Sequence, residues 1–109
     1  MSLHARAGHL YVVGLLALSA LCGCGRRATP AECDRMLTKY IEMSVAGEAN
    51  VERMDPKDRP QVIERRTAAR RAEPTFLRYQ SRCQAEVRKS EFDCAMAANT
   101  PGEWEACIE

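Results

Sequence analysis

Cysteines are the residues of this 109-residue chain most able to do chemistry, and there are six of them. A cysteine side chain can form a disulfide, bind a metal ion as the thiolate, or act as a redox group or nucleophile. Four of the six are widely spaced along the chain: Cys33, Cys83, Cys94 and Cys107. No two of these four lie within about two to four residues of each other, the spacing usual among structural zinc ligands. The spacing therefore favours disulfides over a metal site, and we expect neither a metal nor any other cofactor.

The remaining two cysteines, Cys22 and Cys24, close an N-terminal segment that has the features of an export signal. The segment has a basic start at Arg6, an apolar run over residues 10–21 and small residues near its end. This run is shorter than the roughly 20 residues that a membrane-spanning helix needs, so a cleaved signal is the better interpretation. Export places the chain in an oxidising compartment, where an even set of four cysteines forms disulfides.

The end of this segment, Leu21-Cys22-Gly23-Cys24, resembles the bacterial lipobox. That motif has leucine three places before the modified cysteine and glycine or alanine directly before it, and Cys24 meets both conditions. Cys22 would instead follow the bulky Leu21, and its own place two residues before Cys24 departs from the usual pattern. The resemblance implies that cleavage makes Cys24 the N-terminal, diacylglyceryl-bearing residue. The alternative is ordinary signal-peptidase cleavage near Ala20, with both cysteines left as thiols or as a disulfide.

A lipid at Cys24 implies a membrane as the first partner of this protein. Two or three acyl chains hold a protein at a bilayer where a single chain would let it leave. The next residue is Gly25 and not the aspartate that retains lipoproteins at the inner membrane of enteric bacteria. The resemblance thus implies the periplasmic face of the outer membrane. It divides the chain into a signal (residues 1–23), a lipidated tether (24–30) and a four-cysteine domain (31–109).

The composition of the mature chain limits its function. Removing residues 1–23 takes Arg6 from the 16 basic residues and none of the 15 acidic ones, so the remainder is formally neutral. Neutrality argues against a nucleic-acid binder. Both histidines, His4 and His9, lie in the signal, so the mature chain has no imidazole for acid–base, nucleophilic or metal chemistry. We therefore expect no enzyme activity.

A basic stretch is the surface feature with the most functional promise, and it contains two arginine pairs: Arg65, Arg66, Arg70 and Arg71. Arg66 and Arg70 are four residues apart and share one face of a helix, so their guanidinium groups could converge on an anion. Lipid headgroups, lipopolysaccharide phosphates or the acidic C-terminal part of the domain are candidate ligands. The alternative is a solvated basic face partly neutralised by Glu64 and Glu73.

Aromatic residues give a weaker signal. Trp104 and Tyr40 could line a ligand site, although a single tryptophan in a small helical domain is more often part of the core.

Helices must position these residues, because apolar residues recur every three or four positions and alternating runs are absent. The sequence Thr29-Pro30-Ala31-Glu32 predicts a capping box at the start of a first helix of 18 to 25 residues, which weakens or ends near residues 47–50. Residues 55–60 contain two prolines, which predicts a loop connecting this helix to the next. A second helix is expected from near Asp58 to about Val87, with a kink or break at Pro74.

Two short helices are expected to finish the chain. Ser90-Glu91-Phe92-Asp93 and Thr100-Pro101-Gly102-Glu103 both resemble capping boxes, and each would start a helix of about eight to ten residues. Helices of this length are marginal unless they are packed or cross-linked.

The predicted helices suggest how the four cysteines pair. Cys33 and Cys83 are roughly equidistant from the connection, so an antiparallel hairpin of the first two helices brings them together. Cys94 and Cys107 flank the turn before Thr100 at similar distances. We therefore expect the disulfides Cys33–Cys83 and Cys94–Cys107. The competing arrangement pairs Cys83 with Cys94 and Cys33 with Cys107.

From Glu32 to Glu109 the chain resembles small, uncharacterised helical proteins from myxobacteria and their relatives. The resemblance rests on an early cysteine before a tyrosine-containing helix, on residues 93–100 and on a short helix that ends in Cys107. It supports an all-α fold, a small disulfide-stapled helical bundle with a long antiparallel hairpin and two short C-terminal helices. That group has no established activity.

The expected function is therefore a lipid-anchored, non-enzymatic binding or structural module of the cell envelope. Its partner would be an envelope protein or an anionic envelope component. The alternatives are an anionic-ligand binder that uses the arginine-rich helix and a thiol-redox protein.

Overall fold

The computed structural model describes residues 25–108, and the predicted lipidation site at Cys24 lies outside them. The described chain forms six α-helices, which confirms the all-helical prediction. In chain order they are α1 (Pro30–Ala46), α2 (Ala49–Glu52), α3 (Arg59–Arg71), α4 (Pro74–Glu86), α5 (Lys89–Ala97) and α6 (Pro101–Ala106).

Helix α1 begins with the predicted capping box. The Thr29 hydroxyl accepts a hydrogen bond from the backbone N–H of Glu32 at 3.1 Å, and the Glu32 carboxylate accepts one from the N–H of Thr29 at 2.9 Å. Pro30 occupies the first turn, where its missing N–H costs nothing. The helix ends at Gly47, and α2 adds one further turn after it, so the predicted weakening near residues 47–50 is confirmed.

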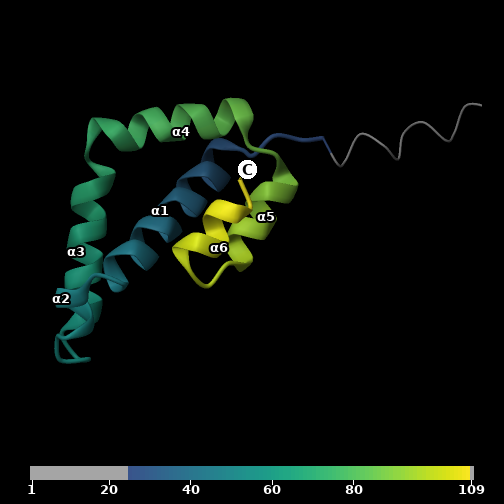
Figure 1. Cartoon of the computed structure of the whole chain (residues 1–109). Helices are drawn as coiled ribbons and strands as arrows, with labels where there is room; N and C mark the ends of the chain where they lie inside the picture. The colour runs from purple at the N-terminus through teal and green to yellow at the C-terminus, as the bar shows by residue number, and fades with distance from the viewer. Residues whose placement is uncertain (1–24, 109) are drawn as a thin grey trace, which may run out of the picture.

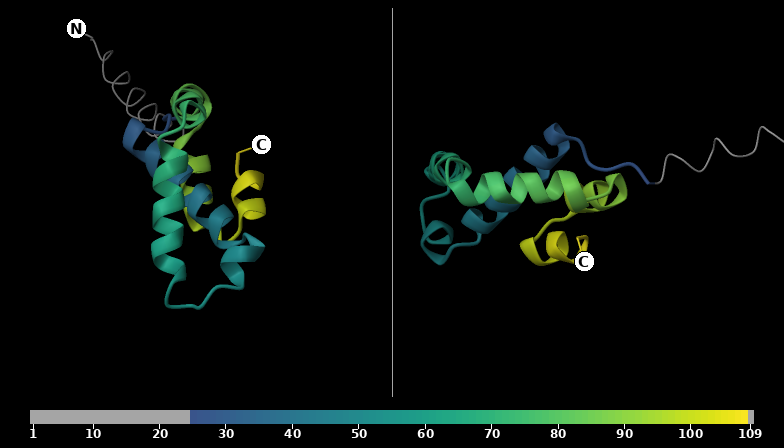
Figure 2. Two further views of the ribbon diagram at one scale, coloured as in Figure 1. Left: turned by 90° about the vertical axis from the view of Figure 1, so that its left-hand side faces the viewer. Right: turned by 90° about the horizontal axis from the view of Figure 1, so that it is seen from above.

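Pro74 divides the predicted second helix into α3 and α4. The proline is the first residue of α4, where it needs no hydrogen-bond donor, and α3 ends at Arg71. Figure 2 shows α3 from the side and α4 end-on in one view, so the chain changes direction sharply between them. The second helix of the predicted hairpin is therefore two helices, α3 and α4, that run in different directions. Helix α3 runs back alongside α1, and α4 then crosses over α1 (Figure 1).

The start of α5 differs from the prediction. The helix begins at Lys89, and the Glu91 carboxylate accepts a hydrogen bond from the N–H of Arg88 at 3.0 Å. The expected box at Ser90 and Asp93 is wrong, because Glu91 caps the helix at Arg88, two residues earlier. Helix α6 starts as predicted, since the Thr100 hydroxyl accepts from the N–H of Glu103 at 3.1 Å. At six residues α6 is shorter than expected.

Both predicted disulfides are present, and the competing pairing is absent from the described chain. Cys33–Cys83 joins the start of α1 to the last turn of α4 across a sequence separation of 50 residues. Cys94–Cys107 joins α5 to the end of α6 across 13 residues. The first bond is buried, whereas Cys94 is exposed and Cys107 is half-buried.

The main core is built around the Cys33–Cys83 disulfide and takes residues from every part of the domain except α2 and α3. It consists of Ala28, Cys33, Met36, Cys83, Val87, Phe92, Ala95, Ala98 and Trp104. Val45 and Val51 are fully buried farther along α1 and in α2, away from that cluster. None of the helices described here is long and apolar enough to cross a membrane.

We predict that replacing both Cys33 and Cys83 by alanine lowers the free energy of unfolding by about 4 kcal/mol, because the bond closes a long loop in the unfolded chain. Removing Cys94–Cys107 in the same way should cost about 3 kcal/mol. Urea unfolding followed by circular dichroism measures both values. A Cys33→Ala/Cys83→Ala variant as stable as the parent would contradict this assignment of the core.

Candidate functional site

The segment that follows the predicted lipid site is folded onto the domain. Arg27 and Arg88 form an antiparallel β-bridge. The N–H of Ala28 donates to the carbonyl of Val87 at 2.9 Å, and the N–H of Lys89 donates to the carbonyl of Arg26 at 2.8 Å. Ala28 is buried. Residues 26–28, expected to be part of a short tether, are thus attached to the connection between α4 and α5.

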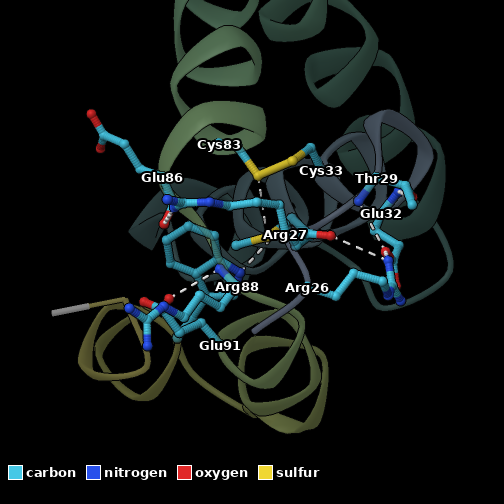
Figure 3. The surroundings of a disulfide bond; sticks show 11 residues. Arg26, Arg27, Thr29, Glu32, Cys33, Cys83, Glu86, Arg88 and Glu91 are labelled. Carbon is cyan, nitrogen blue, oxygen red and sulfur yellow. Dashed lines mark hydrogen bonds and ion pairs between the residues drawn. A yellow bond between two sulfur atoms is a disulfide. The ribbon is translucent and has the colours of Figure 1, made fainter. Parts of the chain in front are cut away.

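Two arginine side chains reinforce this attachment (Figure 3). The Arg26 guanidinium donates to both carboxylate oxygens of Glu32, at 2.8 and 3.3 Å. The hydrogen bond from Arg26, followed by that from the N–H of Thr29, lowers the pKa of Glu32 to about 2. Arg27 donates from Nη1 to the carbonyl of Glu86 at 2.8 Å. The capping carboxylate of α1 therefore also holds Arg26, two residues after the predicted lipidation site.

The four cysteines behind this segment are all in disulfides, so the described chain has no free thiol. The Cys83 sulfur also lies 3.7 Å from the Met36 sulfur, within the core. No group of three or more potential metal ligands occurs within residues 25–108.

A groove of about 420 Å³ is lined by residues of α1, α4 and α6, with α1 as its floor. Its lining is mostly apolar or aromatic: Met36, Leu37, Tyr40, Ile41, Phe76, Tyr79, Val87, Trp104 and Ile108. Tyr79 is 54% exposed, which is high for a large side chain at the edge of such a groove. The groove has the size and lining of a small binding site.

Contacts between α1 and α6 hold the floor and one wall together. The indole N–H of Trp104 donates to the carbonyl of Met36 at 3.0 Å, and the rings of Tyr40 and Trp104 lie 4.7 Å apart. The Tyr40 hydroxyl donates to the Glu105 carboxylate at 2.5 Å. This hydrogen bond, followed by burial, raises the pKa of Tyr40, so the phenol remains neutral at physiological pH. Trp104 is therefore both a core residue and part of the groove.

The charged edge of the groove contains two arginines that already have partners. Arg70 is bound by Glu48, and Arg82 lies 3.5 Å from Glu86. The carboxylate of Glu73, by contrast, makes no ion pair with any residue in the described part of the chain. The available charge at the groove edge is therefore negative.

The four arginines predicted as an anion site are brought to the side of α3, and three of them contact carboxylates. Arg66 and Arg70 both bind Glu48, and Arg71 binds Asp34 in α1 at 2.7 Å. Arg65 is exposed. The partners are Glu48 and Asp34 and not Glu64 or Glu73, because the turn after α1 brings Glu48 next to α3.

Two features of the site could not be found by spacing alone. The groove needs α4 to cross α1, which depends on the direction taken after Pro74. Arg88 is brought beside Arg27 only by the β-bridge. The single sequence signal for the groove was the pair Tyr40 and Trp104, since both can line a ligand site.

Comparison of the chain with models of known protein families, with curated proteins and with solved structures finds no match. The interpretation of the groove and of the N-terminal segment therefore depends on their geometry and chemistry.

The low pKa of Glu32 predicts a specific acid sensitivity. A carboxylate whose folded-state pKa is about 2 contributes stability above its usual pKa near 4.5 and loses that contribution as the pH falls toward 2. We predict that Glu32→Gln reduces the fall in unfolding free energy between pH 5 and pH 2. Urea unfolding at a series of pH values measures the slope. Glu42→Gln, an exposed change in the same helix, is the control, and equal slopes for the two variants would show that the prediction is wrong.

Proposed function

We propose that this protein is a lipid-anchored module of the bacterial cell envelope that binds a partner protein without catalysing a reaction. The observation that carries the binding role is the apolar groove between α4 and α6. The lipobox-like sequence ending at Cys24 supports the anchor.

The folded start of the domain supports an anchored arrangement. Cys24 is two residues before Arg26, whose carbonyl is bonded to Lys89. Two extended residues span at most about 7 Å. A lipid on Cys24 would hold the α4–α5 connection at the bilayer surface. With Gly25 next to the lipidated cysteine, we place the protein at the periplasmic face of the outer membrane.

The chemistry of the described residues supports binding over catalysis. The cysteines are in disulfides, which leaves no thiolate to act as a nucleophile or redox group in residues 25–108. Tyr40 is neutral and its hydroxyl donates a hydrogen bond to Glu105, so it is a poor general base. A thiol-redox role is therefore the weakest of the three functions considered.

The groove fits an amphipathic segment of a partner protein that presents apolar side chains beside a lysine or arginine. Its lining matches apolar side chains, and grooves between helices commonly bind such segments. Its edge offers the carboxylate of Glu73, whereas Arg70 and Arg82 already have acidic partners. Charge complementarity thus favours a basic partner segment over a fatty acid or another anion.

The anionic-ligand alternative is less well supported than the groove. An anion at the α3 surface would have to compete with Glu48 for Arg66 and Arg70 and with Asp34 for Arg71. Breaking these ion pairs costs free energy, which offsets part of the binding free energy of the anion. Arg65 remains available, but one exposed arginine gives little specificity.

The anchor is tested by metabolic labelling with a palmitate analogue. We predict that the parent and Cys22→Ser incorporate the label and that Cys24→Ser does not, because only Cys24 would carry the lipid. Mass spectrometry of the N-terminal peptide gives an independent measurement. Equal labelling of the parent and Cys24→Ser would contradict the assignment.

The groove is tested by placing a photo-cross-linking amino acid at Tyr79 in intact cells. Leu77 is the matched control, because it lies on the same helix and is similarly exposed, at 61% against 54%, but does not line the groove. We predict a cross-linked partner at position 79 and not at position 77. The captured peptide, sequenced by mass spectrometry, should combine apolar residues with lysine or arginine.

Charge reversal at the edge of the groove provides the specificity control. Glu73→Lys should reduce capture at position 79 at least fivefold, because a basic segment would then meet a like charge. Equal capture at positions 77 and 79, or capture unaffected by Glu73→Lys, would rule out this partner.

A further inference from the structure

The corner between α4 and α5 presents two arginines whose charges are not matched by carboxylates. Arg27 and Arg88 face each other across the β-bridge, and both are exposed. Arg27 donates only to the backbone carbonyl of Glu86, a neutral group. Within residues 25–108 the Arg88 side chain makes no ion pair. Both guanidinium groups therefore retain donors and charge for an external anion (Figure 3).

The other cations of this corner already have acidic partners. Arg26 is bound by Glu32 at 2.8 Å. Lys89 is bound by Asp93 and lies 3.8 Å from Glu32. Arg82 and Glu86 form a pair, and the Glu91 carboxylate accepts from the backbone of Arg88. Internal pairing thus distinguishes Arg27 and Arg88 from their basic neighbours.

We propose that this corner is the bilayer-facing surface of the domain and that Arg27 and Arg88 bind the phosphate groups of membrane phospholipids. The inference rests on the proposed lipid at Cys24. Cys24 lies three residues from Arg27, a reach of about 10 Å when extended. The guanidinium groups then lie within the polar headgroup layer, where the planar guanidinium can bind phosphate through two parallel hydrogen bonds.

This placement orients the groove with respect to the membrane. Helix α4 ends at the corner, and its first residue, Pro74, lies at the far end of the helix (Figure 1). The groove follows α4, from Val87 near the corner to Phe76 near the other end. It therefore runs along the flank of the domain, away from the bilayer, and stays open to a partner while the anchor is inserted.

The test uses the mature lipidated protein reconstituted into vesicles that contain phosphatidylglycerol. A photo-cross-linking amino acid replaces either Ser90, exposed at the corner, or Asp55, exposed in the connection between α2 and α3 at the opposite end of the domain. We expect lipid adducts, measured by mass spectrometry, at position 90 and at least tenfold fewer at position 55. Similar yields at the two positions would overturn the proposed orientation.

Charge reversal tests the two arginines. Each basic residue near an anionic surface contributes about fivefold to binding, so Arg27→Glu/Arg88→Glu should lower the adduct yield at position 90 by tenfold or more. Arg53→Glu/Arg65→Glu changes the net charge equally and should leave the yield within twofold. Equal losses in both double variants would overturn the headgroup contact.

Two further measurements distinguish a loss of the arginine–phosphate contact from a loss of folding or of the lipid anchor. Arg88→Glu alone removes no hydrogen bond to Glu86 and should still lower the yield about fivefold. An unchanged yield would overturn the role of Arg88. The mass of the N-terminal peptide reports the lipid separately. A peptide without lipid refutes the proposed function and this inference, whereas a lipidated protein with equal adducts at positions 55 and 90 refutes this inference alone.

Discussion

The Cys33–Cys83 disulfide joins the start of α1 to the last turn of α4, and the main core, the groove and the N-terminal segment are built around this bond. It holds α4 across α1, which forms one side of the groove. It also places Val87 where its carbonyl receives the N–H of Ala28. A domain this small buries a limited core, so a covalent link between distant segments provides a large share of its stability. The attachment of residues 26–28 and the groove thus depend on one bond.

Ion pairs then determine which charges remain on the surface. The arginine-rich side of α3 looks like an anion site in the sequence, yet Glu48 binds two of its arginines and Asp34 a third. At the α4–α5 corner, Arg26, Arg82 and Lys89 are also paired, whereas Arg27 and Arg88 make no ion pair with any residue in the range 25–108. A basic run therefore indicates where cations are concentrated, and the fold determines which of them can bind something else.

The two proposed binding surfaces are connected through α4. Its C-terminal end meets the segment that leads to Cys24, and its flank forms the groove. A lipid on Cys24 and headgroup contacts at the corner would fix one end of this helix at the membrane. The groove would then extend away from the bilayer, at a distance and angle set by α4. A short connection would thus orient the domain as well as retain it.

Local sequence determined the helices, their caps and the disulfides, because these depend on residues close together or on approximate helix lengths. The capping box at Thr29, the break at Pro74 and both disulfides were predictable in this way. The start of α5 was placed two residues late, because two overlapping capping patterns compete there and Glu91 caps Arg88.

Only the tertiary structure decided which surfaces are available. The direction taken after Pro74 forms the groove, and the bridge between Arg27 and Arg88 joins residues that are far apart in the chain. Glu48 contacts α3 because the chain turns at Gly47, and residue spacing alone does not predict the direction of that turn. Short-range patterns report backbone propensity and burial. The contacts that neutralise a charge or open a groove depend on the relative directions of whole helices, and packing around the Cys33–Cys83 bond sets those directions.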